Sequence, residues 1–297
     1  MEIRKIQRTG DMHYLYLPTS WCKEHSITSD SRVNLAKGGG GSLIITPTIQ
    51  KKQPKHIELG LPENNLDIIN KLVVACYINP ADSFRITLEK PLDYRELLDQ
   101  KRLLNVEFVE IENKGKTIVC ESSIHAGEPD ILLRTMVNKV NNLLVVMTKN
   151  PDKDLIQKYE EEVDRNRVMI DKAVIGSMTY KIESKLKIVD LYYIALIAKS
   201  MERLVDHCIV LDKNDAKFLE EVLEVIKSLK DVIDLAIDPQ KKFDYHSAIQ
   251  FSQKALAIKE EPITGIKSYH KVRIRRYLVN ISEVLIDWAI TNETEAV

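Results

Sequence analysis

Two pairs of acidic residues have a spacing that suits a metal ion. Glu160 and Asp164 lie four residues apart, and so do Glu202 and Asp206. In an α-helix this spacing puts both carboxylates of a pair on one side, beside an apolar stripe. If two such helices face each other, four carboxylates converge, and they cannot all stay ionised at a partly buried seam without a cation. We therefore predict that these four residues bind a divalent metal through oxygen ligands.

Arginines offer an alternative way to neutralise the same carboxylates. Arg167 follows the first pair and Arg203 lies within the second, and carboxylates four residues apart are often a solvated, ion-paired face. His207 lies about 100° around the helix from Asp206, so we rank it below the carboxylates as a ligand. The pattern does not distinguish iron, zinc and magnesium.

The acidic pairs fall in a region that reads as almost continuous helix. The predicted helices cover residues 130–147, 151–178, 186–212, 214–236, 242–259 and 267–290. Short links at Asn150-Pro151, Asp238-Pro239 and residues 262–265 separate them. Long amphipathic helices with such links are typical of helical bundles.

A weak internal repeat divides this region into two predicted three-helix bundles. Residues 201–207 align with residues 275–281, three helices later, although only a Leu-Val pair is identical. In the second copy Arg276 and Asn280 replace the acidic pair, and arginine cannot ligate a cation. We therefore expect at most one metal site per chain, in the first bundle, and we expect Arg276 to pair with an acidic neighbour or an anion.

The first 50 residues read as a small β domain. Residues 3–7 and 13–17 predict two strands around a turn at 9–11. A short helix at 19–23 and strands at 32–36 and 43–45 follow, and residues 46–55 predict a linker. So few short strands cannot bury enough apolar surface alone, which favours a dimer.

Charge is distributed unevenly along the chain. Residues 1–60 hold nine Lys and Arg against five Asp and Glu, whereas the whole chain has a net charge of −1. A basic N-terminal domain on a mildly acidic remainder is consistent with DNA binding. The candidate DNA contacts are Arg4, Lys5 and Arg8, with Arg32 and Lys37 behind them. The other interpretation is a domain that only dimerises.

Between these regions, residues 56–128 predict a small α/β unit. Residues 66–78 and 93–104 have helical character. Residues 84–88, 106–111 and 117–120 predict strands, the last two around a Lys114-Gly115 turn. The unit has no glycine-rich phosphate loop and no nucleophile elbow.

The N-terminal pattern resembles the AbrB/SpoVT swapped-hairpin family of DNA-binding domains. The resemblance rests on Glu-Ile-Arg-Lys-Ile-Gln-Arg at 2–8, Tyr-Leu-Pro at 16–18 with Trp21, and Ser-Arg-Val at 31–33. It implies a homodimer with interleaved hairpins and a basic DNA face. Thr19 stands after Leu-Pro, where this family usually carries Lys or Arg.

The helical region resembles the PhoU family of phosphate-uptake regulators, whose repeats carry Glu/Asp-x-x-x-Asp. The resemblance rests on Glu-Arg-Leu-Val-Asp-His at 202–207 and Glu-Glu-Glu-Val-Asp-Arg at 160–165. The two resemblances together look like the archaeal form of this family. They imply a mainly α protein with a dimerising domain at 1–50, the α/β unit at 56–128 and two PhoU-like bundles at 129–297.

The implied function is regulation of phosphate uptake, with DNA and a second copy of the chain as partners. The alternative is an interaction protein that docks a phosphate transporter or signalling protein without binding DNA. We expect no enzyme, because no nucleophile–base pair or cofactor motif occurs. The longest apolar run, at 191–198, is too short to span a bilayer, and no secretory leader opens the chain. We therefore expect a cytoplasmic protein.

Overall fold

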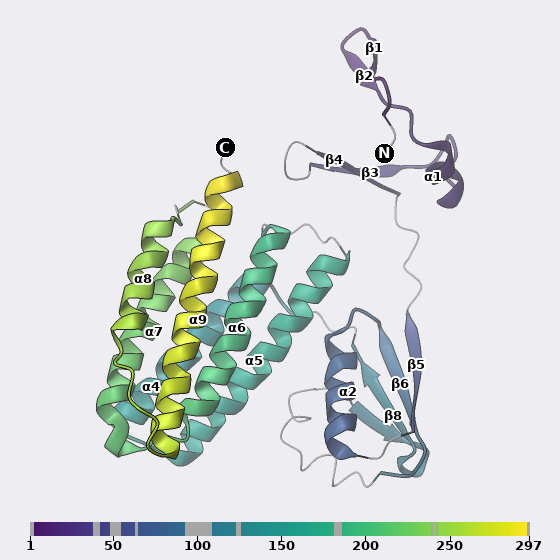
Figure 1. The fold of residues 1–297 in the computed structure, drawn as a ribbon. Coiled ribbons are helices and arrows are strands. Elements are labelled where there is room, and N and C mark those ends of the chain that lie inside the picture. Colours follow the sequence, from purple (N-terminus) through teal and green to yellow (C-terminus); the bar gives the residue numbers. More distant parts are fainter. Residues whose placement is uncertain are drawn as a thin grey trace. The chain divides into compact units, whose positions relative to one another are not determined.

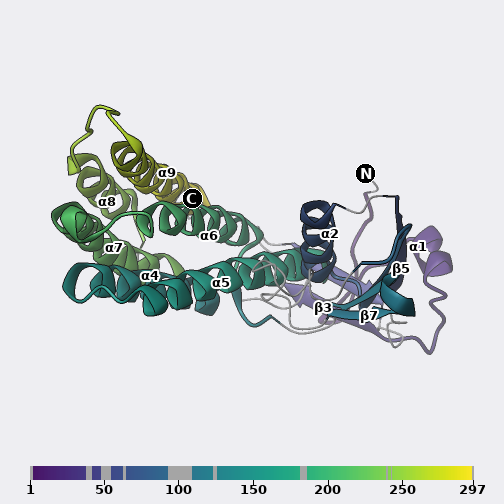
Figure 2. The same cartoon turned by 90° about the horizontal axis from the view of Figure 1, so that it is seen from below.

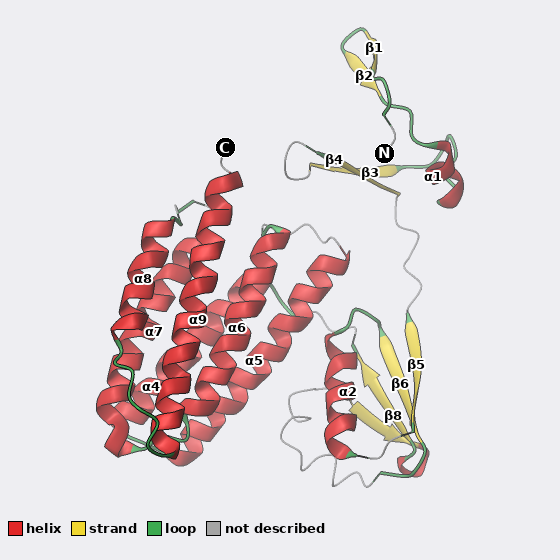
Figure 3. Cartoon of the chain, in the orientation of Figure 1, coloured by secondary structure: helices red, strands yellow, loops and turns green. Residues whose placement is uncertain are grey.

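A computed structural model describes most of the chain. The described residues are 3–37, 42–47, 55–62, 65–92, 109–122, 126–180, 186–238, 240–241 and 243–295. The chain divides into two compact units, Met1–Pro54 and Lys55–Val297. Figure 1 labels the elements, and Figure 3 shows that the described strands all belong to the N-terminal part of the chain, together with two α-helices, and that the described C-terminal part is helical.

The first unit contains two antiparallel hairpins and a short helix. Its elements are β1 (Gln7–Thr9), β2 (Met12–Tyr14), α1 (Thr19–Glu24), β3 (Val33–Lys37) and β4 (Leu43–Pro47). β1 pairs with β2 and β3 with β4. Gly10 has a φ of +60°, which suits the two-residue turn between β1 and β2.

The predicted short helix and the later hairpin are confirmed, but the first two strands are shorter than expected, and the first lies further along the chain and overlaps its predicted range only at residue 7. β1 begins at residue 7 and not at 3, because the residues before it pair with no described strand of this chain. β2 ends at residue 14 and not at 17. The predicted linker begins later than expected, since β4 continues through Pro47.

The described part of the first unit shows no buried core. None of its residues with a described exposure is buried, and several large apolar side chains are open to solvent. Ile3 is 90% exposed, Ile6 67% and Leu35 63%. A monomer of this unit therefore buries little of the apolar surface that normally stabilises a domain.

The second unit begins with a four-stranded sheet. Its elements are β5 (His56–Leu61), α2 (Leu66–Ile78), β6 (Ser83–Leu88), β7 (Val109–Glu112), the 3-10 turn η2 (Asn113–Gly115) and β8 (Thr117–Glu121). The strand order is β5-β6-β8-β7. β5 and β6 are parallel and joined through α2, whereas the other pairs are antiparallel. A dozen or more residues must join parallel neighbours, and α2 supplies that connection.

Local signals explain most of this unit. The Asn65 side chain accepts a hydrogen bond of 2.9 Å from the backbone N–H of Asp67 and caps α2, which covers the predicted residues. Gly115 has a φ of +87°, and a Cβ at this position would clash with the Leu92 carbonyl oxygen. β5 was not expected from the sequence. The predicted helix at 93–104 lies outside the described residues.

The rest of the second unit is helical, as predicted. Its elements are α4 (Pro129–Lys149), α5 (Lys153–Tyr180), α6 (Ile188–Cys208), the short η3 (Lys213–Asp215), α7 (Ala216–Ile237), α8 (Tyr245–Ala257) and α9 (Ile266–Glu295). These confirm the six predicted helical segments. One apolar core draws residues from all six long helices. It crosses the boundary between the two predicted three-helix bundles, since α6 packs along α9 and α4 along α7.

Polar contacts fix the register of α6 against α9. The indole Nε1 of Trp288 donates a buried hydrogen bond of 2.7 Å to Asp190 Oδ1. Tyr193 stacks on the same indole, and its hydroxyl lies 2.8 Å from Thr291 Oγ1. α6 also packs against α5, and this packing brings the predicted acidic pairs into proximity.

The α/β elements dock on α5. α5 runs from the helical body to α2, as Figures 1 and 2 both show. Val168 of α5 belongs to the core of the sheet, and Lys172 Nζ reaches the carbonyl oxygens of Tyr77 and Ser122 at 2.8 and 2.5 Å. One helix therefore joins the sheet to the six-helix core.

Candidate metal centre

α5 and α6 each bury an apolar stripe and keep an acidic pair beside it. On α5, Val163 and Ile170 are fully buried, while Glu160 and Asp164 are half-buried. On α6, Leu204 and Val205 are buried, with Glu202 half-buried and Asp206 exposed. The helical period thus places each pair at the edge of the seam between the two helices.

The seam brings three of the four predicted ligands within reach of one ion. Glu160, Asp164 and Asp206 each offer a carboxylate oxygen, and these three oxygens lie within 4.8 Å of one another. Oxygens on opposite sides of a cation with bonds of 2.0–2.6 Å are about 4–5 Å apart. The spacing therefore suits a hard divalent cation.

Glu202, the fourth predicted ligand, lies outside this triad but close to it. Among the charged neighbours of Asp164, Glu202 raises the pKa of that carboxyl most, ahead of Glu160 and Asp206. All four carboxylates therefore share one electrostatic environment. Their convergence across α5 and α6 agrees with the arrangement that the spacing predicted.

Asp164 is the centre of this cluster. Burial, followed by the charges of the three other carboxylates, raises its pKa to about 7. Its Oδ1 atom is buried and has no hydrogen-bond partner among the described residues. A buried carboxylate oxygen without a donor carries a cost that a proton or a metal ion would remove.

Arg167 offsets the acidic charge at Asp164 only in part. Arg167 donates a hydrogen bond of 2.7 Å to Asp171, one turn further along α5. It lowers the pKa of Asp164 less than any of the three carboxylates raises it. Arg203 is exposed to solvent. At Asp164, therefore, guanidinium groups do not fully neutralise the carboxyl.

His207 faces away from the acidic cluster. Its Nδ1 lies 2.7 Å from Nδ1 of His270 on α9, and its ring stacks on Tyr277. The low rank of His207 as a ligand agrees with this position. The sequence analysis did not pair these histidines, because 63 residues separate them and no local pattern relates them.

The second copy of the repeat lacks an acidic cluster at the matching positions. Arg276 is exposed and forms no ion pair with a described residue, so the acidic neighbour expected for it is not found. The basic residues near it do find partners. Lys271 lies 3.0 Å from Asp215, and Arg275 lies 3.3 Å from Glu260. Lys271 and Arg275 are therefore ion-paired, and they do not point only into solvent from the surface of α9.

The predicted DNA-binding residues lie on two separate hairpins of the first unit. Arg4 and Lys5 precede β1 and are exposed. Arg8, on β1, donates a hydrogen bond of 2.7 Å to the Gly10 carbonyl, and its guanidinium lies 3.5 Å from Asp11. Arg32 is exposed just before β3, and Lys37 ends that strand.

Comparisons with protein-family models, with curated proteins and with solved structures found no match to this chain. Among the described helices, none is long and apolar enough to cross a membrane. The geometry of the two units therefore carries the functional argument.

Proposed function

We propose that this chain is a dimeric, metal-responsive regulator of phosphate uptake. The observation that carries the proposal is the convergence of Glu160, Asp164 and Asp206, with the unpartnered oxygen of Asp164 at its centre. A structural ion pair would satisfy that oxygen, whereas an oxygen-ligand cation site requires it to be available. The resemblance of residues 202–207 to the PhoU helix motif supports the phosphate context.

In this proposal the helical body senses the metal. A bound cation would neutralise the acidic seam and hold α5 against α6. In the metal-free state, mutual repulsion of the carboxylates weakens that packing at neutral pH. Iron, zinc and magnesium all accept carboxylate ligands, and the described residues of the two repeats supply such a site once.

The first unit supplies dimerisation and DNA contact in this proposal. Its exposed apolar residues, such as Ile3, Ile6 and Leu35, favour burial against a second copy. The basic residues Arg4 and Lys5, which come before β1, would then contact phosphates of DNA. Both expectations agree with the resemblance to swapped-hairpin domains.

A second function is favoured by the position of Arg8. Its guanidinium is engaged by its own turn, through Gly10 and Asp11, and is thus less available to DNA. The first unit would then only dimerise, and the body would dock a phosphate transporter or signalling protein. Gel-shift assays on the full chain separate the two functions, because only the first requires DNA binding.

Metal binding by the full chain tests the sensor. We expect titration calorimetry with Mg²⁺, Zn²⁺ or Fe²⁺, together with elemental analysis, to give at most one ion per chain. Asp164→Asn should weaken binding at least tenfold, whereas Asp154→Asn, an exposed carboxylate on the same helix, should not. Equal binding by the two variants would contradict the site.

Deletion of the gene tests the phosphate context separately. We expect altered phosphate uptake, or altered expression of uptake genes, when external phosphate changes. An Asp164→Asn allele should reproduce part of this phenotype, since it removes the sensor but not the fold. An unchanged response across low and high phosphate would place the protein in another process.

A further inference from the structure

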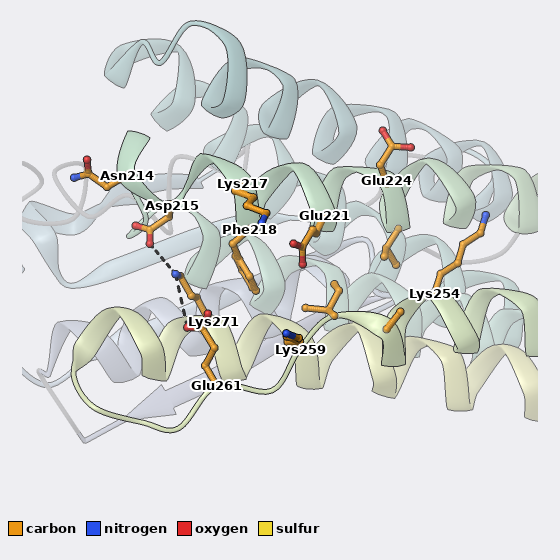
Figure 4. A pocket seen from close by; sticks show the side chains of 13 residues that line it. Asn214, Asp215, Lys217, Phe218, Glu221, Glu224, Lys254, Lys259, Glu261 and Lys271 are labelled. Atoms are coloured by element: carbon orange, nitrogen blue, oxygen red, sulfur yellow. Dashed lines mark ion pairs between the residues drawn. The ribbon is translucent and has the colours of Figure 1, made fainter.

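A groove lies on the helical body, away from the acidic seam. It is formed by α7, the end of α8, the segment that follows α8 and the start of α9, and it encloses about 790 Å³. This volume is in the range of sites that hold small organic ligands. Figure 4 shows Lys217, Phe218 and Glu221 on α7, with Lys254 and Lys259 on the opposite wall.

The floor of the groove is apolar. Val225 of α7 and Ile258 at the end of α8 are nearly fully buried below it, and Phe218 is half-buried in its wall. An aromatic ring and two aliphatic side chains form an apolar surface, and the apolar part of a ligand can be buried against it.

Three of the four acidic side chains that line the groove already have a cation beside them. Lys271 lies 3.0 Å from Asp215 and 3.8 Å from Glu261, and these ion pairs close one end of the groove in Figure 4. At the other end, Glu224 lies 2.6 Å from Lys227. The Glu224 pair carries no net charge, whereas Asp215 and Glu261 share one lysine and leave one negative charge at their end of the groove.

The remaining charges are mostly positive. Lys217 and Lys259 form no ion pair with any described residue, and the Lys254 ammonium donates only to the Ser228 hydroxyl at 3.0 Å. Glu221 is the one acidic lining residue of the groove without an ion-pair partner in the described chain. Between the paired ends, three lysines against one glutamate give a local excess of positive charge, although the acidic and basic side chains of the whole lining are equal in number.

We propose that this groove binds a small organic anion with an apolar body. The negative group would lie between Lys217 and Lys259, and the apolar part would rest on Phe218 and the floor. The groove is separate from the acidic seam, which attracts cations. This inference therefore does not depend on the proposed metal site.

An aromatic sulfonate tests the proposal on the full chain. The probe is 8-anilinonaphthalene-1-sulfonate, measured by fluorescence titration and calorimetry at low ionic strength. We expect saturable binding of one probe per chain. In the double variant Lys217→Glu/Lys259→Glu, the Kd should rise at least tenfold, because each change replaces an attraction by a repulsion.

Two controls distinguish recognition of the anionic group from nonspecific hydrophobic binding of the probe. Lys230→Glu makes the same change on α7 at an exposed position outside the groove, and it should leave the Kd unchanged. The uncharged analogue N-phenyl-1-naphthylamine should bind the wild type and the double variant equally. Circular dichroism and thermal unfolding identify any variant that loses its fold. If the double glutamate variant does not fold, Lys217→Gln/Lys259→Gln replaces it, and we expect a smaller rise in the Kd.

Four outcomes overturn the proposal. The first three are the absence of saturable binding, an equal rise in Kd for Lys230→Glu, and binding of the probe that is insensitive to both lysines. The third would mark the groove as an apolar docking surface for a protein segment and not as an anion site. If the lysines do control binding, competition by unlabelled carboxylate or phosphate esters should displace the probe, and a failure of every such anion to compete would also overturn the proposal.

Discussion

Lys172 on α5 is tied to Ser122 at the end of β8, with its Nζ 2.5 Å from the Ser122 carbonyl oxygen. The same ammonium also donates to the Tyr77 carbonyl and lies 3.9 Å from the centre of the Tyr77 ring. Burial lowers the pKa of Lys172 to about 8. One side chain thus closes the C-terminal end of α2 and fastens the sheet to the helix that carries Asp164.

Lys172→Met should weaken this docking. The Ser122 carbonyl is then without its lysine donor, and an unsatisfied buried polar group costs about 1–3 kcal/mol. We expect the free energy of unfolding, measured in urea, to fall by this amount. Lys158→Met, the same change at an exposed position of α5, should change it by less than about 0.5 kcal/mol. Equal effects of the two variants would show that Lys172 does not stabilise the interface.

Asp164 predicts a pH-dependent stability of metal-free protein. Its pKa is about 7 in the folded state and 3.8 as a free side chain, so the folded state binds the extra proton between these values. The free energy of unfolding therefore falls as the pH rises from about 4 to about 7. Above pH 7 the ionised Asp164 continues to destabilise the folded state by this full amount. The neutral variant Asp164→Asn removes this cost.

Thermal unfolding after chelation checks the sign of this effect. Asp164→Asn should stabilise the chain at pH 8 by on the order of 2 kcal/mol, and the gain should vanish near pH 4. Asp154→Asn serves as the exposed control. A gain that is independent of pH would assign the effect to packing and not to titration.

The two repeats should differ in metal binding. Asp206→Asn removes one member of the triad, so we expect its metal content by elemental analysis to fall well below that of wild type. Asn280→Asp restores the acidic residue type at the matching position of α9, but no second pair of described carboxylates faces it, and we expect no additional ion. Full retention of metal by Asp206→Asn, or a second ion in Asn280→Asp, would show that the repeats are assigned wrongly.

Dimerisation should depend on the apolar residues of the first unit. Ile3→Ser/Ile6→Ser should shift the full chain toward monomer in light scattering, because both side chains are exposed in a single chain. Ile263→Ser is the control, since Ile263 is 61% exposed on the helical body. A wild-type chain that is monomeric at every concentration would exclude the dimer.

DNA binding should be electrostatic. Arg4→Ala/Lys5→Ala/Arg8→Ala should lower the slope of log K against log salt by about one unit for each phosphate that the variant can no longer bind. Lys153→Ala/Lys158→Ala/Lys230→Ala removes the same charge from the body and should leave the slope unchanged. Equal slopes for wild type and both variants would favour a first unit that only dimerises.

The long helices could be predicted from the sequence because their determinants are local. The apolar period and the short links between helices mark α4 to α9, and the same period places Glu160 with Asp164 and Glu202 with Asp206 beside the apolar stripes. Short strands were predicted less well. β5 was missed, and β1 was placed at residues 3–7 and not at Gln7–Thr9, because strands depend on pairing partners that the local sequence does not specify.

What the tertiary structure decided is which of these surfaces meet. Only the packing of α5 on α6 gives the half-buried Asp164 one buried oxygen without a described hydrogen-bond partner and places it among three other carboxylates. His207 contacts His270, which is 63 residues away in the sequence, and Lys172 contacts Ser122, which is 50 residues away. Residue spacing along a helix sets the direction of a side chain, whereas burial, pKa and charge balance arise from neighbours that only the folded chain assembles.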